Sequence, residues 1–190
     1  SGNVVLAFTM SNPLPKHGKV NVTFPAGFDL TNTPVASSST SEIDGTFVTT
    51  VAGQVVTITR QNDGTDEAAG AITDLTLSNI GNPGVSGNTG TFTITTTDSS
   101  GATIDTLATV PAVRITGVIS SATITPASLV AGASGNAVLA FTTASELPAN
   151  GKVVVTFPAG FDLTNTPAAT SSDVDGTFVT TVTDQVVTIT

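Results

Sequence analysis

The chain has 190 residues, and only 10% of them are charged, whereas an average soluble domain has about 25%. Fourteen acidic against five basic residues give a formal net charge of −9, which disfavours nucleic acid and anionic membranes as partners because both require a basic patch. The absence of Cys, Trp and Tyr excludes disulfides, thiolate metal sites and aromatic carbohydrate platforms, and no apolar run approaches the roughly 20 residues of a membrane span.

An internal repeat dominates the sequence. Residues 1–34 align with residues 134–167 without a gap, and 26 of the 34 positions are identical. After a two-residue deletion, residues 44–59 align with residues 175–190, with 14 of 16 positions identical. The chain therefore uses one type of module at least twice, with a period near 133 residues.

The first clear strand prediction covers residues 18–25, GKVNVTFP. Val20, Val22 and Phe24 alternate with polar residues, and the second copy keeps this alternation in residues 151–158. A period of two places one set of side chains in a core and the other set outward. The Pro-Ala-Gly that follows ends the strand, because Pro cannot donate to a sheet ladder and Gly permits a turn.

The next predicted element is a β-hairpin over residues 45–59. Its two alternating runs are separated by Ala52-Gly53, which the second copy replaces with Thr183-Asp184. Further along the chain, three more segments have the composition of strands, namely residues 71–80, 90–98 and 102–110. Only residues 66–72, DEAAGAI, resemble a helix, and they are too few to form a stable one.

A second module is predicted to begin after residues 111–117, with an opening strand over residues 119–130 that is kinked at Pro126. Short strands at regular spacing, separated by Gly, Pro, Asn and Ser, indicate an all-β fold of tandem immunoglobulin-like antiparallel β-sandwich modules. We expect one module at residues 1–113 that lacks its opening strand, and the N-terminal part of a second, homologous module at residues 114–190.

Aligning the two copies predicts that the second module lacks the counterparts of residues 60–110. Half a sandwich leaves apolar surface in water and strand edges unpaired. Two explanations remain open at this point. Either the natural chain continues in both directions, or a neighbouring chain supplies the missing strands by β-strand addition.

Two acidic segments, residues 61–67 and 171–176, resemble fragments of calcium-binding loops, in which alternate carboxylates supply oxygen ligands. Neither completes the EF-hand pattern, and we interpret each as an Asp-Gly turn in preference to a calcium loop. Asp29 and Asp162 are predicted to form turns. We assign no metal ligand from the sequence, although calcium remains a possible cofactor.

No residue pattern predicts catalysis. His17 is the only histidine, and Asn150 replaces it in the second copy, which argues against a catalytic triad. The glycine-rich segments at residues 81–84 and 87–90 are typical of turns, because they lack the lysine of a phosphate-binding loop. We therefore predict that the chain is not an enzyme and assign no catalytic or cofactor-binding residue; Asn21, in the sequon Asn-Val-Thr, is a possible glycan site.

The outward strand positions are mostly Thr, Ser, Ala and Val, so the surface is poorly protected against association. The segments GKVVVTFPAGFDL, LTLSNIGNPGVSGNTGTFTITT and ATIDT resemble tandem immunoglobulin-like repeats of large, Cys-poor surface and secreted proteins of bacteria and microbial algae. This resemblance implies an extracellular or cell-surface β-sandwich array. We expect a structural subunit of an extracellular filament, fibre or appendage, whose partners are other copies or further modules; the alternative is a stalk segment of a calcium-dependent adhesin.

Overall fold

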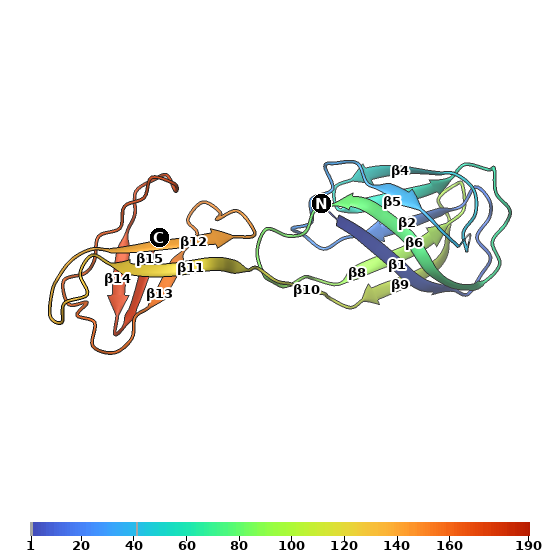
Figure 1. The fold of residues 1–190 in the computed structure, drawn as a ribbon. Coiled ribbons are helices and arrows are strands. Elements are labelled where there is room, and N and C mark those ends of the chain that lie inside the picture. Colours follow the sequence, from blue (N-terminus) through green and yellow to red (C-terminus); the bar gives the residue numbers. More distant parts are fainter. Residues whose placement is uncertain (1, 41) are drawn as a thin grey trace. The chain divides into compact units, whose positions relative to one another are not determined.

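A computed structural model describes residues 2–40 and 42–190. Within these residues every regular element is a β-strand, every strand pairing is antiparallel and no helix forms, so the predicted all-β class is confirmed. The chain divides into two compact units, Ser1–Gly117 (unit 1) and Val118–Thr190 (unit 2), which are described separately (Figure 1).

Unit 1 contains one five-stranded sheet, one three-stranded sheet and a short strand pair (Figure 1). The five-stranded sheet has the order β4-β5-β2-β8-β9, and the three-stranded sheet has the order β1-β6-β3. The strands are β1 (Gly2–Met10), β2 (Lys19–Thr23), β3 (Val35–Ser37), β4 (Phe47–Ala52), β5 (Val55–Arg60), β6 (Gly70–Ile80), β7 (Gly87–Asn88), β8 (Phe92–Thr97), β9 (Thr103–Val110) and β10 (Arg114–Ile115). The pair is formed by β7 and β10.

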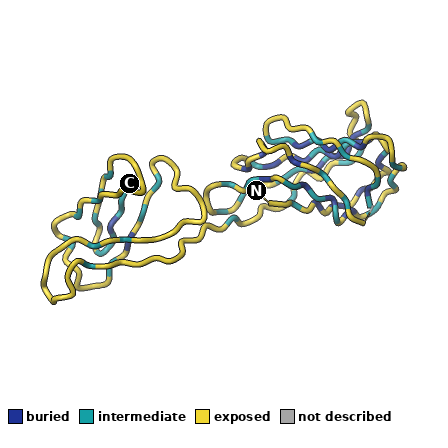
Figure 2. The backbone as a smooth tube through the Cα atoms, turned by 45° about the horizontal axis from the view of Figure 1, so that its top comes forward, coloured by how far each residue is buried: buried dark blue, intermediate teal, exposed yellow. Residues whose placement is uncertain are grey.

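The two larger sheets contribute side chains to one hydrophobic core. The predicted alternation holds in β2 and β5, where Val20, Val22, Val56 and Ile58 are buried and their neighbours face outward. Leucines and isoleucines of β6 and apolar residues of β1 belong to the same buried cluster. Figure 2 shows this burial along the strands of unit 1. The core therefore depends on strands that are far apart in the sequence.

Strand β6 keeps its apolar side chains in the core despite a break in alternation. Ile72, Leu75, Leu77 and Ile80 are all buried, although strict alternation would turn some of them outward. Two register shifts between β1 and β6 provide the extra residues. A β-bulge re-aims the following side chains, so irregular pairing preserves a continuous apolar face.

The predicted hairpin forms, but its turn lies one residue later than Ala52-Gly53. Ala52 pairs with Val55, so Gly53 and Gln54 make the turn. Gly53 has a φ of 57°, and its counterpart Asp184 has a φ of 53°. Positive φ suits Gly and is tolerated by Asp, which explains why this position accepts both residues and why the turn starts there.

The helix-like segment at residues 66–72 is extended instead. The backbone of Glu67 exchanges two hydrogen bonds with that of Leu14, at 2.8 and 2.9 Å, and β6 begins at Gly70. These long-range backbone hydrogen bonds override the weak local preference for a helix. The predicted strands over residues 71–80, 90–98 and 102–110 correspond to β6, β8 and β9.

Unit 2 repeats part of one sheet of this pattern and adds a strand pair that unit 1 does not contain. The predicted opening strand forms as β11 (Ile119–Pro126), ends at the proline and pairs with β12 (Ala137–Thr143). A three-stranded sheet of order β13-β15-β14 contains β13 (Val153–Thr156), β14 (Thr180–Thr183) and β15 (Val186–Ile189). These three strands are the sequence counterparts of β2, β4 and β5 and are arranged in the same order.

Candidate assembly surfaces

A buried arginine organises the loops at one end of unit 1. The alternation of Val56 and Ile58 continues to Arg60, so its side chain enters the core and is only 3% exposed. The guanidinium donates to the carbonyl oxygens of Leu14, Pro15 and Thr65 at 3.1, 3.0 and 2.6 Å. The alternation of buried and outward positions in residues 55–60 could have identified Arg60 as a core residue, but the prediction from the sequence did not include it.

Asp44 provides the charge partner of Arg60. Its carboxylate lies 2.6 Å from the guanidinium and also accepts hydrogen bonds from the N–H and hydroxyl of Thr65. The Thr65 N–H, with a contribution from the arginine, lowers the pKa of Asp44 against the opposing effect of desolvation. Asp44 therefore takes part in an ion pair that ties two loops to the core.

The acidic segment at residues 61–67 closes loops in the structure. The carboxylate of Asp63 accepts hydrogen bonds from the N–H and hydroxyl of Thr46, and that of Asp66 accepts from the N–H of Lys16 at 2.9 Å. The Thr46 hydroxyl, and then its N–H, lower the pKa of Asp63. These carboxylate oxygens bind donors of the chain itself, which is the arrangement of a structural loop.

No group of three His, Asp or Glu side chains in the described part of the chain could hold a metal ion. In residues 171–176, Asp173 is held locally, because its N–H donates to the Ser171 hydroxyl at 3.1 Å and its carboxylate accepts from Ser172 at 3.2 Å. Calcium binding by this segment, and with it the adhesin-stalk alternative, stays a sequence-based prediction.

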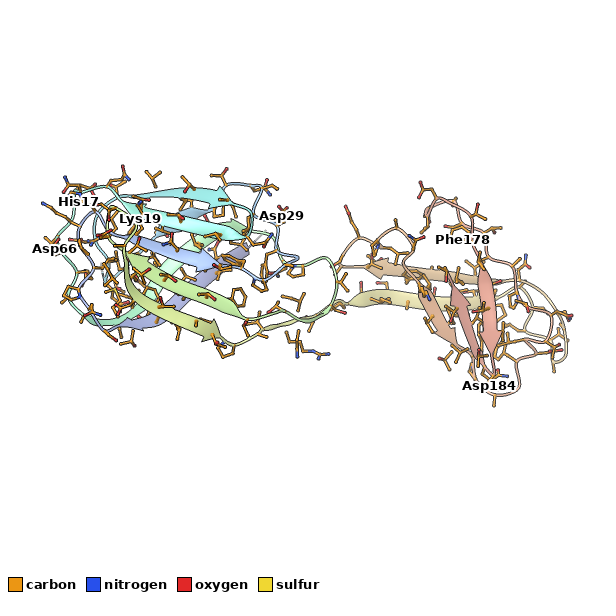
Figure 3. The ribbon with its side chains drawn as sticks, turned by 180° about the vertical axis from the view of Figure 1, so that it is seen from behind. His17, Lys19, Asp29, Asp66, Phe178 and Asp184 are labelled. Atoms are coloured by element: carbon orange, nitrogen blue, oxygen red, sulfur yellow. The ribbon has the colours of Figure 1, made fainter. Side chains whose placement is uncertain are left out.

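The remaining sequence candidates are turn or surface residues. Asp29 and Asp162 each accept hydrogen bonds from the N–H and hydroxyl of the Thr two residues later, which forms the same turn in both units. His17 is exposed in a loop near Lys19, at the end of unit 1 opposite Asp29 (Figure 3). Asn21 lies in the central strand β2, and its side-chain oxygen accepts from the Thr57 hydroxyl at 2.8 Å.

The long loop after β3 is attached to β6 through carboxylates. Asp74 accepts hydrogen bonds from Ser38, Ser39 and Thr40, and Glu42 accepts from Thr73. The Thr40 N–H is the largest cause of a strongly lowered pKa at Asp74, with Ser38 contributing further. The Asp74 carboxylate, whose pKa is lowered, stabilises the folded state through these hydrogen bonds only while it is ionised.

Unit 1 should therefore lose stability in acid. The lowered pKa values of Asp44, Asp63 and Asp74 lie below their ordinary 3.8, so their stabilising contribution is complete above about pH 4 and is lost as the pH falls through the folded-state values. We expect the Tm of unit 1 to stay level from pH 7 to about 5 and to fall steadily from about pH 4 to 2. Circular dichroism melts with peptide-resolved hydrogen exchange would measure this, and a level Tm down to pH 2 would contradict it.

Identical residues of the repeat are buried in unit 1 and exposed in unit 2. Leu14 is 0% exposed, whereas its counterpart Leu147 is 41% exposed; Phe28 is 6% exposed, whereas Phe161 is 42% exposed. In Figure 2 the chain of unit 2 carries far fewer buried positions than that of unit 1. Residues 118–190 contain no counterparts of β6, β8 and β9, the strands that complete the core of unit 1.

One strand edge in unit 2 is open at a defined place. In unit 1, β2 lies between β5 and β8. In unit 2, β13 pairs with β15, the counterpart of β5, and its other edge has no partner within residues 118–190. The open edge of β13 is therefore the edge that β8 occupies in unit 1.

A second surface is the outward side of the five-stranded sheet, which we call the outer face. One row of paired residues crosses all five strands, and the rows beside it are also rich in Thr and Val. The central row consists of Thr50, Thr57, Asn21, Thr95 and Thr106. Lys19 is the one charged side chain among the outward residues of β2, β4 and β5.

The same outward positions in unit 2 are also largely uncharged. Val154, Thr181 and Thr188 are the counterparts of Asn21, Thr50 and Thr57, and Lys152 is the counterpart of Lys19. Val154 is well exposed. Both copies of the repeat therefore present β-branched, uncharged side chains on this side of the sheet.

Comparison with known proteins gives no match: no family model fits this chain, and no curated protein or solved structure is significantly similar to it. In the described residues, no helix is long and apolar enough to cross a membrane.

Proposed function

We propose that this chain is a structural segment of an extracellular filament, fibre or appendage, built from tandem immunoglobulin-like β-sandwich modules that associate with other copies and carry out no catalysis. The uncharged outer face of unit 1, repeated in unit 2, is the observation that carries this proposal. The resemblance of the repeat to modules of Cys-poor surface proteins supports the extracellular setting.

Charge distribution favours association through the outer face. Two chains with a net charge of −9 repel each other, so they approach most easily where neither presents carboxylates. The acidic side chains described above lie in loops, such as those of Asp29 and Asp66 (Figure 3), or on the other sheet, where Asp74 belongs to β6. The outer face is thus an area with a single Lys and no carboxylate among the outward residues of β2, β4 and β5, on an acidic molecule, which suits a second copy of the same face.

The size of the outer face suits a contact that is repeated many times. Five strands at about 4.8 Å spacing and three outward residues along each strand cover on the order of 400 Å². A stable interface buries about 800 Å² on each partner, so one face alone should bind weakly. Modules linked in tandem add such contacts, and the second engagement becomes effectively intramolecular.

Lysines placed on the outer face should therefore weaken assembly. The test compares the natural chain with a Thr50→Lys, Thr95→Lys double variant by sedimentation velocity and electron microscopy, at about 1 to 500 μM protein. We expect concentration-dependent, side-by-side association of the natural chain. The variant should need an at least tenfold higher concentration, which corresponds to about 1.4 kcal/mol, because two ammonium groups would oppose each other across each contact.

The matched control places the same two charges in exposed loops of unit 1. Val85→Lys with Ser99→Lys changes the net charge equally but leaves the outer face intact. We expect this control to associate like the natural chain. Equal weakening by both double variants, or a natural chain that stays a monodisperse monomer up to 500 μM, would refute the proposed function.

A further inference from the structure

The open side of unit 2 has a counterpart in unit 1 that shows what fits it. In unit 1, β8 pairs with β2 in a defined register, in which Val22 faces Ile94 and Asn21 faces Thr95. Strand β13 has the same sequence as β2 except for Val154, which replaces Asn21. Its neighbour β15 already occupies the other edge. The backbone groups of β13 that remain free are therefore those that a β8-type strand pairs with.

Aromatic packing adds a second, side-chain requirement. In unit 1, the rings of Phe24, Phe28 and Phe92 form a mutual cluster with edge-to-face contacts, and their centroids are 5.3 to 5.6 Å apart. In unit 2, Phe157 and Phe161 keep the first of these contacts at 5.3 Å, and the third ring has no counterpart. The ring that completes the cluster in unit 1 comes from the first residue of β8.

We propose that the open edge of β13, together with the rings of Phe157 and Phe161, is a binding site for a strand of the β8 type, Phe-Thr-Ile-Thr-Thr-Thr, supplied by a further copy of this repeat. The phenylalanine completes the aromatic cluster, and the isoleucine packs beside Val155 in the register that Ile94 has beside Val22. The threonines continue the uncharged outer face across the new strand. This inference rests on the proposed function, because it takes the strand from another repeat of the same assembly.

Specificity follows from the two requirements together. Any extended peptide can pair with an exposed strand edge through its backbone, so the edge alone selects little. The rings of Phe157 and Phe161 favour an aromatic residue, and the pleat of the sheet places a β-branched residue two positions later on the same face. Polar residues then occupy the positions between and after these two. A peptide without the aromatic residue should therefore bind much more weakly than one with it.

The experiment adds a synthetic peptide of residues 89–112, which contains β8 and β9, to the natural chain at a concentration where sedimentation shows the chain to be monomeric. Hydrogen exchange followed by mass spectrometry reads the amides of residues 153–157. We expect their exchange to slow at least tenfold, whereas the amides of β2 in unit 1 stay unchanged because β8 already covers that edge. A peptide with Phe92→Ala should give less than a third of this protection at the same concentration.

A covalent version tests the same site without a free peptide. Because Thr190 is the counterpart of Thr59, residues 60–117 can be fused directly after Thr190 to reproduce the natural Thr-Arg junction. The fused chain should protect residues 153–157 as strongly as unit 1 protects β2. The inference is overturned if neither the peptide nor the fusion slows exchange at residues 153–157, or if the Phe92→Ala peptide protects these amides as strongly as the natural peptide does. Binding of the peptide to the monomeric chain is measured separately from association of the chains into filaments. Either proposal can therefore fail without the other.

Discussion

Replacing Leu14 by alanine should lower the free energy of unfolding of unit 1 by about 3 kcal/mol. The side chain is completely buried, and its backbone holds Glu67 in the extended segment before β6. Removing it leaves a cavity where a loop joins the core, and the surroundings can collapse only in part. Peptide-resolved hydrogen exchange can assign this loss to unit 1, which is necessary because the chain has no Trp or Tyr to report unfolding by fluorescence.

The repeat supplies the matched control for this experiment. Leu147→Ala changes the same residue in the same sequence context, but the side chain is 41% exposed. We expect unit 2 to lose less than about 1 kcal/mol. Equal losses at both positions would contradict the conclusion that identical residues have different roles in the two units.

Replacing Arg60 by alanine should destabilise unit 1 by about 3 kcal/mol, because a buried donor group disappears from beneath two loops. The carbonyl oxygens of Leu14, Pro15 and Thr65 would each lose one donor, and the Asp44 carboxylate would lose its only ion-pair partner among the described residues. Chemical denaturation followed by circular dichroism would measure the change, and hydrogen exchange would show the loops at residues 14–16 and 44–46 opening first.

Arg114→Ala is the appropriate comparison for this variant. It also removes one positive charge, but Arg114 is exposed in β10. We expect its effect to stay within about 0.5 kcal/mol. If the two arginine variants were equally stable, Arg60 would contribute through net charge alone, and the buried network would not hold the loops.

Local alternation was enough to predict the strands but could not predict their neighbours. The apolar positions of β2 and β5, and the breaks at Pro25 and Gly53, are visible in the sequence because they depend on nearby residues. The insertion of β8 between β2 and β9 depends on a pairing across about 70 residues, which no local pattern encodes. Sequence reasoning therefore predicted the all-β class but not the order of strands in the sheets.

The candidate surfaces could also be predicted only in part from the sequence. The uncharged outward residues could be predicted from parity, and the shortage of partner strands in unit 2 from the repeat alignment. The open edge of β13 could not be predicted, because it requires knowing that β5 and β8 flank β2 on opposite sides. The role of Asp44 was also hidden, because its partner Arg60 lies 16 residues away and arginine is a residue type that composition alone would place at the surface.

The position of β8 inside its sheet has a consequence for synthesis on the ribosome. Residues 19–60, which contain β2, β4 and β5, leave the exit tunnel before β8, which is complete only at residue 97. At about 5 to 20 residues per second, the 37 residues from 60 to 97 take roughly 2 to 7 seconds to translate. During this interval one edge of β2 in every nascent module has no partner strand. When several ribosomes translate one messenger RNA, the length of this interval therefore sets how far apart they must be for neighbouring nascent chains not to pair at these edges.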